Sequence, residues 1–145
     1  FVSDFIVDNL SKMNCDITNR KGPESVIAGP VEHLRTDFEF ELPSHKINDF
    51  VELMHPTPAV CGAPRVGAFD MIAKMEQHDR GLYAGFIGFV GKETKLYVNL
   101  RCAQLFENEC FLHVGGGLTV DSNPEAEWLE TENKAKTLLN VIEKL

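Results

Sequence analysis

The segment from residue 82 to residue 114 limits the possible folds more than any other part of the chain. Three runs rich in β-branched and aromatic residues follow one another there, at Leu82–Val90, Lys95–Cys102 and Glu109–Val114. The connections are short turns at Gly91–Thr94 and Glu107–Asn108, whereas a parallel pairing needs a crossover of about a dozen residues or more. The segment therefore predicts an antiparallel meander.

Helical patterns flank the predicted meander on both sides. Asn123 is a typical N-cap residue, Pro124 suits the first helical position, and Glu125 has the charge that the helix dipole favours there. The predicted helices are Phe1–Met13, Ser44–Met54 with Ser44 as the N-cap, Val66–Gln77 and Pro124–Leu145. Together these patterns predict an α+β fold in which antiparallel strands pack with helices.

The remaining segments are predicted from their turn and strand residues. Residues 14–25 are rich in turn formers and contain a Gly-Pro pair, so we expect turns there. Residues 25–42 contain several β-branched residues, and polar and apolar residues alternate around Thr36–Leu42, which predicts one or two strands. Residues 55–65 combine several prolines with a glycine, which predicts a loop without regular structure.

Length and composition indicate a single soluble domain. The chain has 145 residues, of which 43% are hydrophobic and 25% are charged, values that are ordinary for a globular protein. No apolar run is long enough to span a membrane, and no signal peptide opens the sequence. A net charge of −8 without a basic stripe argues against nucleic-acid binding. The cysteines lack zinc-ligand spacing, so we expect reduced thiols in a cytoplasmic protein: Cys15, Cys61, Cys102 and Cys110.

A glycine segment followed by carboxylates is the main candidate for a functional site. Gly115–Gly117 end the last predicted strand, and their bare amides can bind an anionic group. On the helix that follows, Glu127, Glu130 and Lys134 fall on one stripe. That spacing alone is typical of a solvated face with a Glu130–Lys134 pair. Combined with the glycines, it predicts an anionic small molecule bridged to the protein by Mg²⁺, which uses one or two carboxylates and completes its shell with other oxygens.

Two side chains of the strand region are further candidates for ligand binding. Arg101 stands in the middle of a predicted strand, where it would either clamp a carboxylate with two hydrogen bonds or point outward to solvent. Tyr83 is either a core or edge aromatic residue, or a residue whose hydroxyl, beside Gly85, reaches a ligand. The residue pattern leaves both alternatives open.

Five ordered motifs resemble the C-terminal half of the chorismate-utilising enzymes. They read "VEHL", "HPTPAVCGAPR", "DRGLYAGFIGFV", "LYVNLRCAQL" and "HVGGGLTVDSNPEAEWLETENKAKTLLNVI", and they cover nearly the whole chain. The family includes the first component of anthranilate synthase, aminodeoxychorismate synthase, salicylate synthase and isochorismate synthase. The "HPTPAVCG" motif resembles isochorismate synthases most, because related lyases and aminating enzymes tend to carry Thr where Ala59 stands.

The resemblance implies a role for individual residues. Glu130 would ligate Mg²⁺ with Glu127 beside it, directly or through water. His33 in "VEHL" matches a family histidine near the reacting ring and is the catalytic candidate, although its position alone would suggest a structural histidine. The residues implied to hold substrate carboxylates are Tyr83, Arg101 and Lys134, with the amides of Gly115, Gly116 and Gly117. The family usually shows Gly-Ala-Gly there, and the difference leaves the amides in place.

The implied reaction is the Mg²⁺-dependent isomerisation of chorismate to isochorismate, for menaquinone or catecholate siderophore synthesis. An anthranilate, aminodeoxychorismate or salicylate synthase and a non-catalytic binding domain are the alternatives. Family members are several hundred residues long, and their base lysine, acid glutamate and another Mg²⁺-binding glutamate lie upstream of this segment. We therefore expect residues 1–145 to be the C-terminal portion of a chorismate-binding domain, inactive alone and prone to self-association through uncovered apolar surface.

Overall fold

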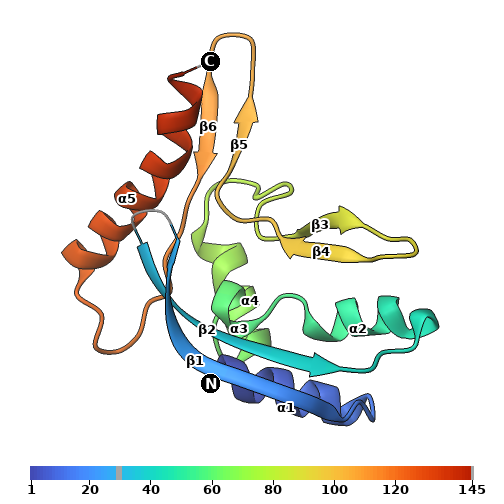
Figure 1. The fold of residues 1–145 in the computed structure, drawn as a ribbon. Coiled ribbons are helices and arrows are strands. Elements are labelled where there is room, and N and C mark those ends of the chain that lie inside the picture. The colour runs from blue at the N-terminus through green and yellow to red at the C-terminus, as the bar shows by residue number, and fades with distance from the viewer. Residues whose placement is uncertain (29–30, 145) are drawn as a thin grey trace. The chain divides into compact units, whose positions relative to one another are not determined.

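The computed structural model describes residues 1–28 and 31–144 and divides into two compact units, Phe1–Ala73 and Lys74–Leu145 (Figure 1). Each unit combines helices with antiparallel strand pairs, which confirms the predicted α+β class. That residues 1–145 are a portion of one domain stays a prediction. In the part of the chain that is described, no helix is both long and apolar enough to cross a membrane.

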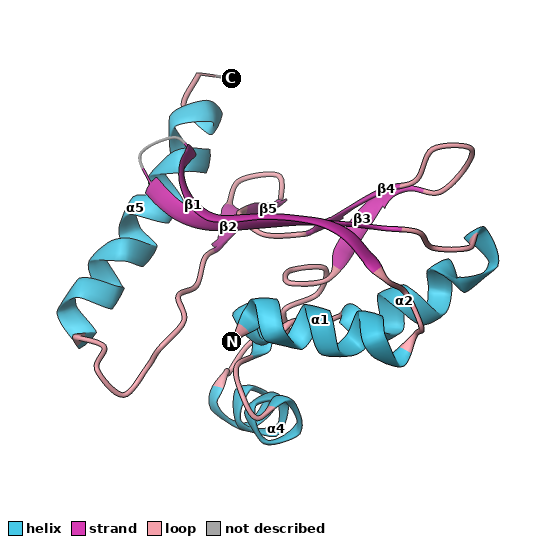
Figure 2. Cartoon of the chain, turned by 60° about the horizontal axis from the view of Figure 1, so that its bottom comes forward, coloured by secondary structure: helices cyan, strands magenta, loops and turns pink. Residues whose placement is uncertain are grey.

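The first unit is built on a long antiparallel hairpin (Figure 2). Its strands are β1 (Ile17–Ala28) and β2 (Val31–Phe40), paired from Ile17 opposite Phe40 to Ala28 opposite Val31. The strands predicted within residues 25–42 are therefore present. The same pairing shows that the turns predicted for residues 14–25 are wrong, because most of that segment belongs to β1.

The turn residues of that segment form a bulge inside β1. The pairing register shifts between Lys21 and Glu24, with Gly22 between them. Gly22 has a φ of +99°, and a Cβ at this position would overlap the carbonyl oxygen of Arg35 on the facing strand. Only glycine combines this backbone conformation with so close an approach. The residues that suggested a turn therefore let the strand bend and continue.

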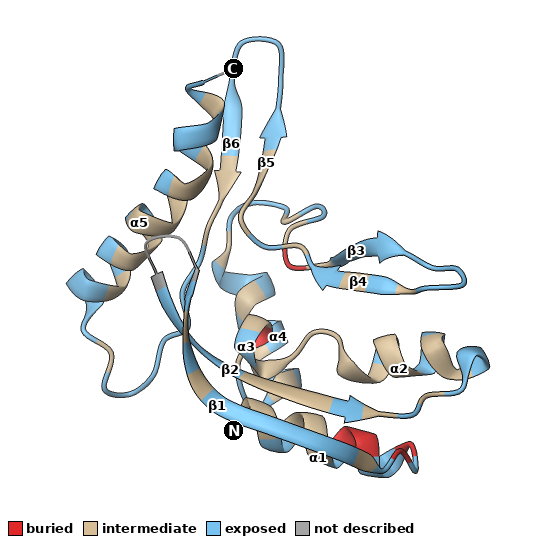
Figure 3. Ribbon diagram, in the orientation of Figure 1, coloured by how far each residue is buried: buried red, intermediate tan, exposed pale blue. Residues whose placement is uncertain are grey.

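The core of the first unit lies around the end of α1 (Val2–Lys12), which confirms the predicted first helix. Leu10 is 0% exposed, and Met13 and Cys15 are also buried. Half-buried apolar residues of α1, of the two strands, of the segment after β2 and of the next helix pack against these three: Ile6, Ile17, Phe40, Leu42, Phe50, Leu53 and Met54. The cluster fastens α1 to the hairpin, and Figure 3 shows its buried positions at the end of α1, with further buried positions at α3 (Pro58–Cys61) and before β3 (Phe86–Phe89).

The second helix starts differently from the prediction. A short 3₁₀ turn, η1 (Ser44–Lys46), precedes α2 (Ile47–Met54). The Lys46 amide donates to the Pro43 carbonyl oxygen at 2.9 Å. Neither element has a side-chain cap hydrogen bond, so the prediction of Ser44 as an N-cap is wrong. The tighter 3₁₀ bond satisfies a backbone amide at the helix start instead.

The predicted loop at residues 55–65 contains one helical turn, α3 (Pro58–Cys61). The prediction of no regular structure is therefore wrong for this part. Pro58 stands at the first position of the helix, where a backbone N–H has no partner within the helix, so its absence in proline costs nothing. The Cys61 amide closes the turn by donating to the Thr57 carbonyl oxygen. The helix predicted next is present as α4 (Arg65–Met75).

The second unit contains two separate hairpins in place of the predicted meander. β3 (Phe86–Phe89) pairs with β4 (Lys95–Val98), and β5 (Cys102–Leu105) pairs with β6 (Cys110–His113). The strand predicted for residues 95–102 is interrupted because the chain turns after Val98. The Leu100 amide donates to the Val98 carbonyl oxygen, and Arg101 has a φ of +51°. A residue in this left-handed conformation cannot continue a strand.

The last helix is the best-predicted element of the chain. α5 (Pro124–Ile142) starts at the predicted proline, and the Asn123 side chain accepts a hydrogen bond from the Ala126 amide at 2.9 Å. Its first turn contains Glu125 and Glu127, whose charges suit the N-terminal end of the helix dipole. The helix contacts β6 and runs beside the β5–β6 hairpin (Figure 1).

We predict that Leu10→Ala destabilises the chain by about 2–5 kcal/mol, because the substitution leaves a cavity at a fully buried site. The free energy of unfolding, measured by urea titration, reports the loss. Leu34→Ala is the matched control, since Leu34 is 79% exposed on β2, and it should change stability by less than about 0.5 kcal/mol. Equal losses in both variants would contradict the position of the core.

Candidate functional site

The predicted site residues of the second unit gather where the glycine segment meets the first turns of α5. Gly115–Gly117 follow β6, and Glu127, Glu130 and Lys134 lie on α5. A hydrogen bond from Lys134 to Gly115 and the close approach of Glu127 to Gly116 join the two segments. Tyr83, just before β3, also reaches the glycine segment.

Lys134 links the helix to the glycine segment. Its Nζ forms an ion pair with Glu130 Oε1 at 2.7 Å and donates a hydrogen bond to the Gly115 carbonyl oxygen at 3.1 Å. The side chain of Lys134 is only 17% exposed. The alternative interpretation of a Glu130–Lys134 pair on one helix face is therefore realised, and the same ammonium group also binds the main chain of the predicted site. Because an ammonium group has three N–H donors, these two contacts leave one for a ligand.

Glu127 fastens the loop between the glycines and α5. Ser122 Oγ donates to Glu127 Oε1 at 2.6 Å and accepts from the Thr119 amide at 3.0 Å. The other carboxylate oxygen of Glu127 points to the glycine segment, since a Cβ on Gly116 would lie 3.4 Å from it. One oxygen of Glu127 therefore holds the loop, and the other faces the predicted binding surface.

Tyr83 places its hydroxyl against Gly115. A Cβ at Gly115 would lie 2.7 Å from Tyr83 Oη, which is closer than such atoms approach each other. The Tyr83 ring stacks on His113, with centroids 5.3 Å apart and planes 19° apart. Burial raises the pKa of the Tyr83 phenol, the positive charge of Arg80 opposes this, and Glu76 adds to it. The phenol therefore stays protonated at neutral pH and keeps a hydrogen to donate.

Arg101 lies at the turn between β4 and β5. Its half-buried side chain starts from a left-handed backbone conformation, so the position predicted for it in the middle of a strand is wrong. Alternation along "LYVNLRCAQL" could not reveal this, because it reports which side of a strand a residue faces and not where the strand ends. Asn99 donates its amide to Gly85, and Asn99 Nδ2 donates to the Leu82 carbonyl oxygen. The role of Arg101 stays a prediction.

His33 lies on β2 opposite Val26 and is exposed. It belongs to the unit Phe1–Ala73, whereas the other predicted site residues belong to Lys74–Leu145. The catalytic role of His33 stays a prediction that comes from the family resemblance.

The donor chemistry of Glu127 and Glu130 fits Mg²⁺. Among residues 1–28 and 31–144, no group of three or more His, Cys, Asp or Glu side chains is placed to hold a metal ion. Mg²⁺ is usually held by one or two carboxylates, with water and substrate oxygens completing its octahedron. A carboxylate pair one helical turn apart, with one Glu127 oxygen turned to the glycine segment, supplies such a partial set.

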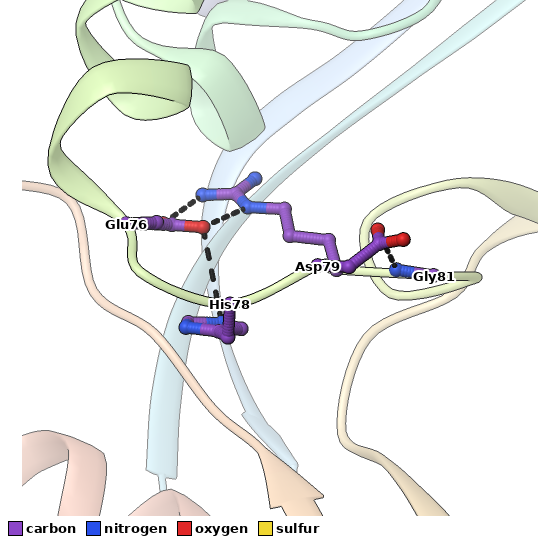
Figure 4. Close-up of polar contacts among 5 residues, drawn as sticks. Glu76, His78, Asp79 and Gly81 are labelled. Carbon is purple, nitrogen blue, oxygen red and sulfur yellow. Dashed lines mark hydrogen bonds and ion pairs between the residues drawn. The ribbon is translucent and has the colours of Figure 1, made fainter.

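The sequence interpretation missed Glu76, Arg80 and His113. Arg80 Nε and Nη2 bind both carboxylate oxygens of Glu76 (Figure 4). The guanidinium carbon of Arg80 lies 5.5 Å from the centroid of the Tyr83 ring. The i,i+4 spacing of Glu76 and Arg80 in "EQHDR" was no reliable signal for their pair, because α4 ends at Met75 and the helical spacing rule does not apply to residues 76–80. No local pattern indicated that His113 stacks on Tyr83, because His113 ends β6 and Tyr83 precedes β3.

A hollow of about 320 Å³ in the first unit contains none of these residues. Its lining residues are Pro56, Arg65, Val66, Phe69 and Asp70. The hollow is open, and three of its five lining residues are apolar. The glycine segment and α5 therefore remain the better candidate site.

We predict that Gly115→Ala destabilises the chain by about 1–3 kcal/mol, because the new Cβ forces the stacked Tyr83 ring to move. Gly117→Ala is the matched control, since a Cβ there meets no atom within 4 Å, and it should stay within about 0.5 kcal/mol of the wild type. Urea unfolding measures both. A Gly115→Ala variant as stable as Gly117→Ala would contradict the close approach of Tyr83.

We also predict that the Tyr83 phenol titrates above its ordinary pKa of 10.0 in the folded chain, because burial disfavours the phenolate. The chain has two tyrosines, so the Tyr97→Phe variant leaves Tyr83 as the single reporter. Phenolate absorbance as a function of pH gives the midpoint. The same variant in denaturant is the control and should return to the ordinary value, and a folded midpoint at or below 10.0 would exclude the buried position.

Comparison with known proteins gives a consistent set of relatives. The family model described as "Chorismate binding enzyme" matches residues 1–143. Isochorismate synthase EntC of Escherichia coli (strain K12) is 38% identical over 122 residues, which are 82% of this chain and 31% of the relative. Anthranilate synthase component 1 of Aquifex aeolicus (strain VF5) is 35% identical over 116 residues, or 78% of this chain and 24% of the relative.

The fold is also similar to a solved structure. A crystal structure described as a 2,3-dihydroxybenzoate-specific isochorismate synthase, DhbC from Bacillus anthracis, superposes with a TM-score of 0.85 at 29% identity. The match covers 98% of this chain and 39% of the other. Against the two curated relatives above, the chain spans about a third of the length or less, at 31% and 24%.

Proposed function

The chain belongs to the family of chorismate binding enzymes, as its motifs predicted, and on this basis we propose that the whole protein is an isochorismate synthase. Relatives named as isochorismate synthases in Escherichia coli and Bacillus subtilis support the assignment. So does a vibriobactin-specific isochorismate synthase of Vibrio cholerae. The proposed reaction converts chorismate to isochorismate, for menaquinone or catecholate siderophore synthesis.

The observation that carries the proposal is the contact between the glycine segment and the acidic face of α5. Lys134 binds Glu130 and the Gly115 carbonyl oxygen at once. Glu127 presents one oxygen to Gly116. A cation, two carboxylates and bare main chain therefore meet at one place, which is the combination that a carboxylate substrate held with a divalent ion requires.

The substrate carboxylates would be held by donors from several segments. The Tyr83 hydroxyl and the remaining Lys134 N–H are donors beside the glycine segment. The amides of Gly115–Gly117 can add contacts to an anion, and the guanidinium of Arg101 is suited to bind a carboxylate through two parallel hydrogen bonds. Charge-assisted bonds of this kind are short and directional, so they would orient the ring as well as bind it.

Glu127 and Glu130 would hold the Mg²⁺ ion. When bound, the ion supplies a positive charge that anchors a substrate carboxylate and stabilises negative charge formed during the reaction. Lys134 has a second task in this arrangement, because its ammonium group binds Glu130 and the Gly115 carbonyl oxygen and so holds the helix and the glycine segment together.

The isomerisation moves a hydroxyl group from C4 to C2 of the ring. Water attacks C2 as the C4 hydroxyl leaves, so a base must accept a proton from the water and an acid must protonate the departing oxygen. We propose that residues outside this chain supply the base and the acid, as the family resemblance implies. His33 would lie near the reacting ring. This chain then contributes mainly substrate and metal binding.

An aminating relative is the second candidate function. Anthranilate synthase components of Aquifex aeolicus and Bacillus caldotenax match this chain in sequence at comparable identity, 35% and 39%. The two candidates differ in the nucleophile, since an aminating enzyme adds ammonia where an isochorismate synthase adds water. Incubation of the whole protein with chorismate and Mg²⁺, with and without ammonia, separates them by product. Anthranilate or salicylate as the sole product would contradict the assignment.

We predict that Glu130→Gln lowers turnover of chorismate by the whole protein by roughly 100-fold or more, because a neutral amide cannot replace a metal-binding carboxylate. The measurement is kcat/KM at several Mg²⁺ concentrations. Glu132→Gln removes the same charge from an exposed position of the same helix and serves as the control. Equal activity in the two variants would exclude Glu130 from the metal site.

That the isolated chain is inactive and self-associates stays a prediction. The second unit exposes large apolar side chains on the β3–β4 hairpin and on α5, among them Phe86, Phe89, Tyr97 and Trp128. Exposed apolar surface of this kind is typical of a contact region, and it supports the prediction.

A further inference from the structure

A series of side-chain contacts outside the predicted site leads to Tyr83. It begins at Glu76, directly after α4, and passes through Arg80. Arg80 Nε donates to Glu76 Oε2 at 2.7 Å, and Arg80 Nη2 donates to Glu76 Oε1 at 2.5 Å. A bidentate pair fixes the plane of the guanidinium group as well as its position.

This ion pair is better shielded than the exposed pairs of the chain. The side chains of Arg80 and Glu76 are 26% and 30% exposed, whereas those of Arg35 and Asp37 are 59% and 42% exposed. The hydrogen bond from Arg80 lowers the pKa of Glu76, so the carboxylate is charged at neutral pH. His78 Nε2, 3.9 Å from Glu76 Oε2, adds a second contact to the same group (Figure 4).

A tight turn brings Arg80 to Tyr83. The Tyr83 amide donates to the Arg80 carbonyl oxygen at 2.9 Å. Asp79 Oδ1 accepts from the Gly81 amide at 2.9 Å (Figure 4). Gly81 has a φ of +53°, a conformation that favours glycine. The guanidinium carbon of Arg80 thereby lies over the Tyr83 ring at 5.5 Å from its centroid, within the range of a cation–π contact.

The Tyr83 ring is therefore contacted by two side chains, the guanidinium group of Arg80 and the imidazole ring of His113. Arg80 contacts it from the turn, and His113 stacks on it with centroids 5.3 Å apart. These contacts leave the hydroxyl at the end of the ring beside Gly115. A ring with both partners has few rotamers open to it, because any large rotation about its side-chain torsions would break a contact.

We propose that Glu76 and Arg80 are positioning residues for substrate binding, which hold the Tyr83 ring so that its hydroxyl donates to a substrate carboxylate at the glycine segment. The inference rests on the proposed function. In the proposed arrangement neither residue touches the substrate, because Glu76 orients Arg80 and Arg80 orients Tyr83. The competing explanation is that the pair only stabilises the turn between α4 and β3.

A double-substitution experiment on the whole protein separates these explanations. Arg80→Lys keeps the charge but loses the bidentate plane, and we expect kcat/KM for chorismate to fall by a factor of roughly 10 to 100. The loss should appear mainly in KM, since a carboxylate contact is made in the bound substrate and the transition state alike. In the Tyr83→Phe background the same change should cost less than about threefold, because the hydroxyl that Arg80 positions is already gone.

Two further variants complete the design. Glu76→Gln keeps Arg80 and removes only the charge that binds its guanidinium group. It should lower kcat/KM in the wild-type background and much less in the Tyr83→Phe background, and it replaces Arg80→Lys in the experiment if that variant does not fold. Arg20→Lys is the matched control, because Arg20 lies over the Phe38 ring at 5.3 Å in the first unit. It should leave kcat/KM unchanged. Thermal unfolding of each variant accompanies the kinetics.

The outcomes distinguish the inference from the proposed function. Equal losses from Arg80→Lys in both backgrounds would overturn the positioning role. A Tyr83→Phe enzyme with wild-type kcat/KM would overturn it as well, together with the binding role of Tyr83. A wild type without chorismate turnover would contradict the proposed function. Phenol titration of the Tyr97→Phe chain then decides the inference, since Arg80→Gln must raise the Tyr83 pKa further if Arg80 lies over the ring, and an unchanged midpoint overturns it.

Discussion

The absence of a side chain at Gly115 is the constraint on which the candidate site depends. Tyr83 Oη approaches this residue so closely that a Cβ would lie 2.7 Å away. The carbonyl oxygen of the same residue accepts a hydrogen bond from Lys134 at 3.1 Å. One glycine therefore joins the segment before β3, the end of β6 and the middle of α5. Any side chain at this position would move the phenol and, with it, the groups that face an anionic ligand.

The polar side chains around the glycine segment each use some of their atoms to hold the structure and leave others for a ligand. Glu127 uses one oxygen to hold Ser122 at 2.6 Å and turns the other to Gly116, so a single carboxylate serves both structure and binding. Lys134 does the same with its several N–H donors. Both side chains project from α5, whose start is capped by Asn123.

Local chemistry explains why some elements could be predicted and others could not. Asn123 and Pro124 define the start of α5 through bonds to residues nearby in sequence, so the helix was predicted correctly at that end. The bulge at Gly22 misled the prediction, since a Gly-Pro pair has the same local preferences in a turn and in a bulge, and the facing Arg35 decides between them. The break after Val98 likewise was not readable from alternation, because the structure makes it with the bond from the Leu100 amide to Val98 and the left-handed backbone of Arg101.

The sequence by itself determined the α+β class, the acidic stripe of Glu127, Glu130 and Lys134, and the bare backbone beside it, because these follow from residue type and spacing. The family came from the resemblance of its motifs. Only the tertiary structure decided that Lys134 binds Gly115 and that Tyr83 stacks on His113 and faces the same glycine. Such contacts join residues far apart in sequence, and their distances depend on how strands and helix pack. Periodicity records which face a side chain occupies, but it carries no information about which distant group meets that face.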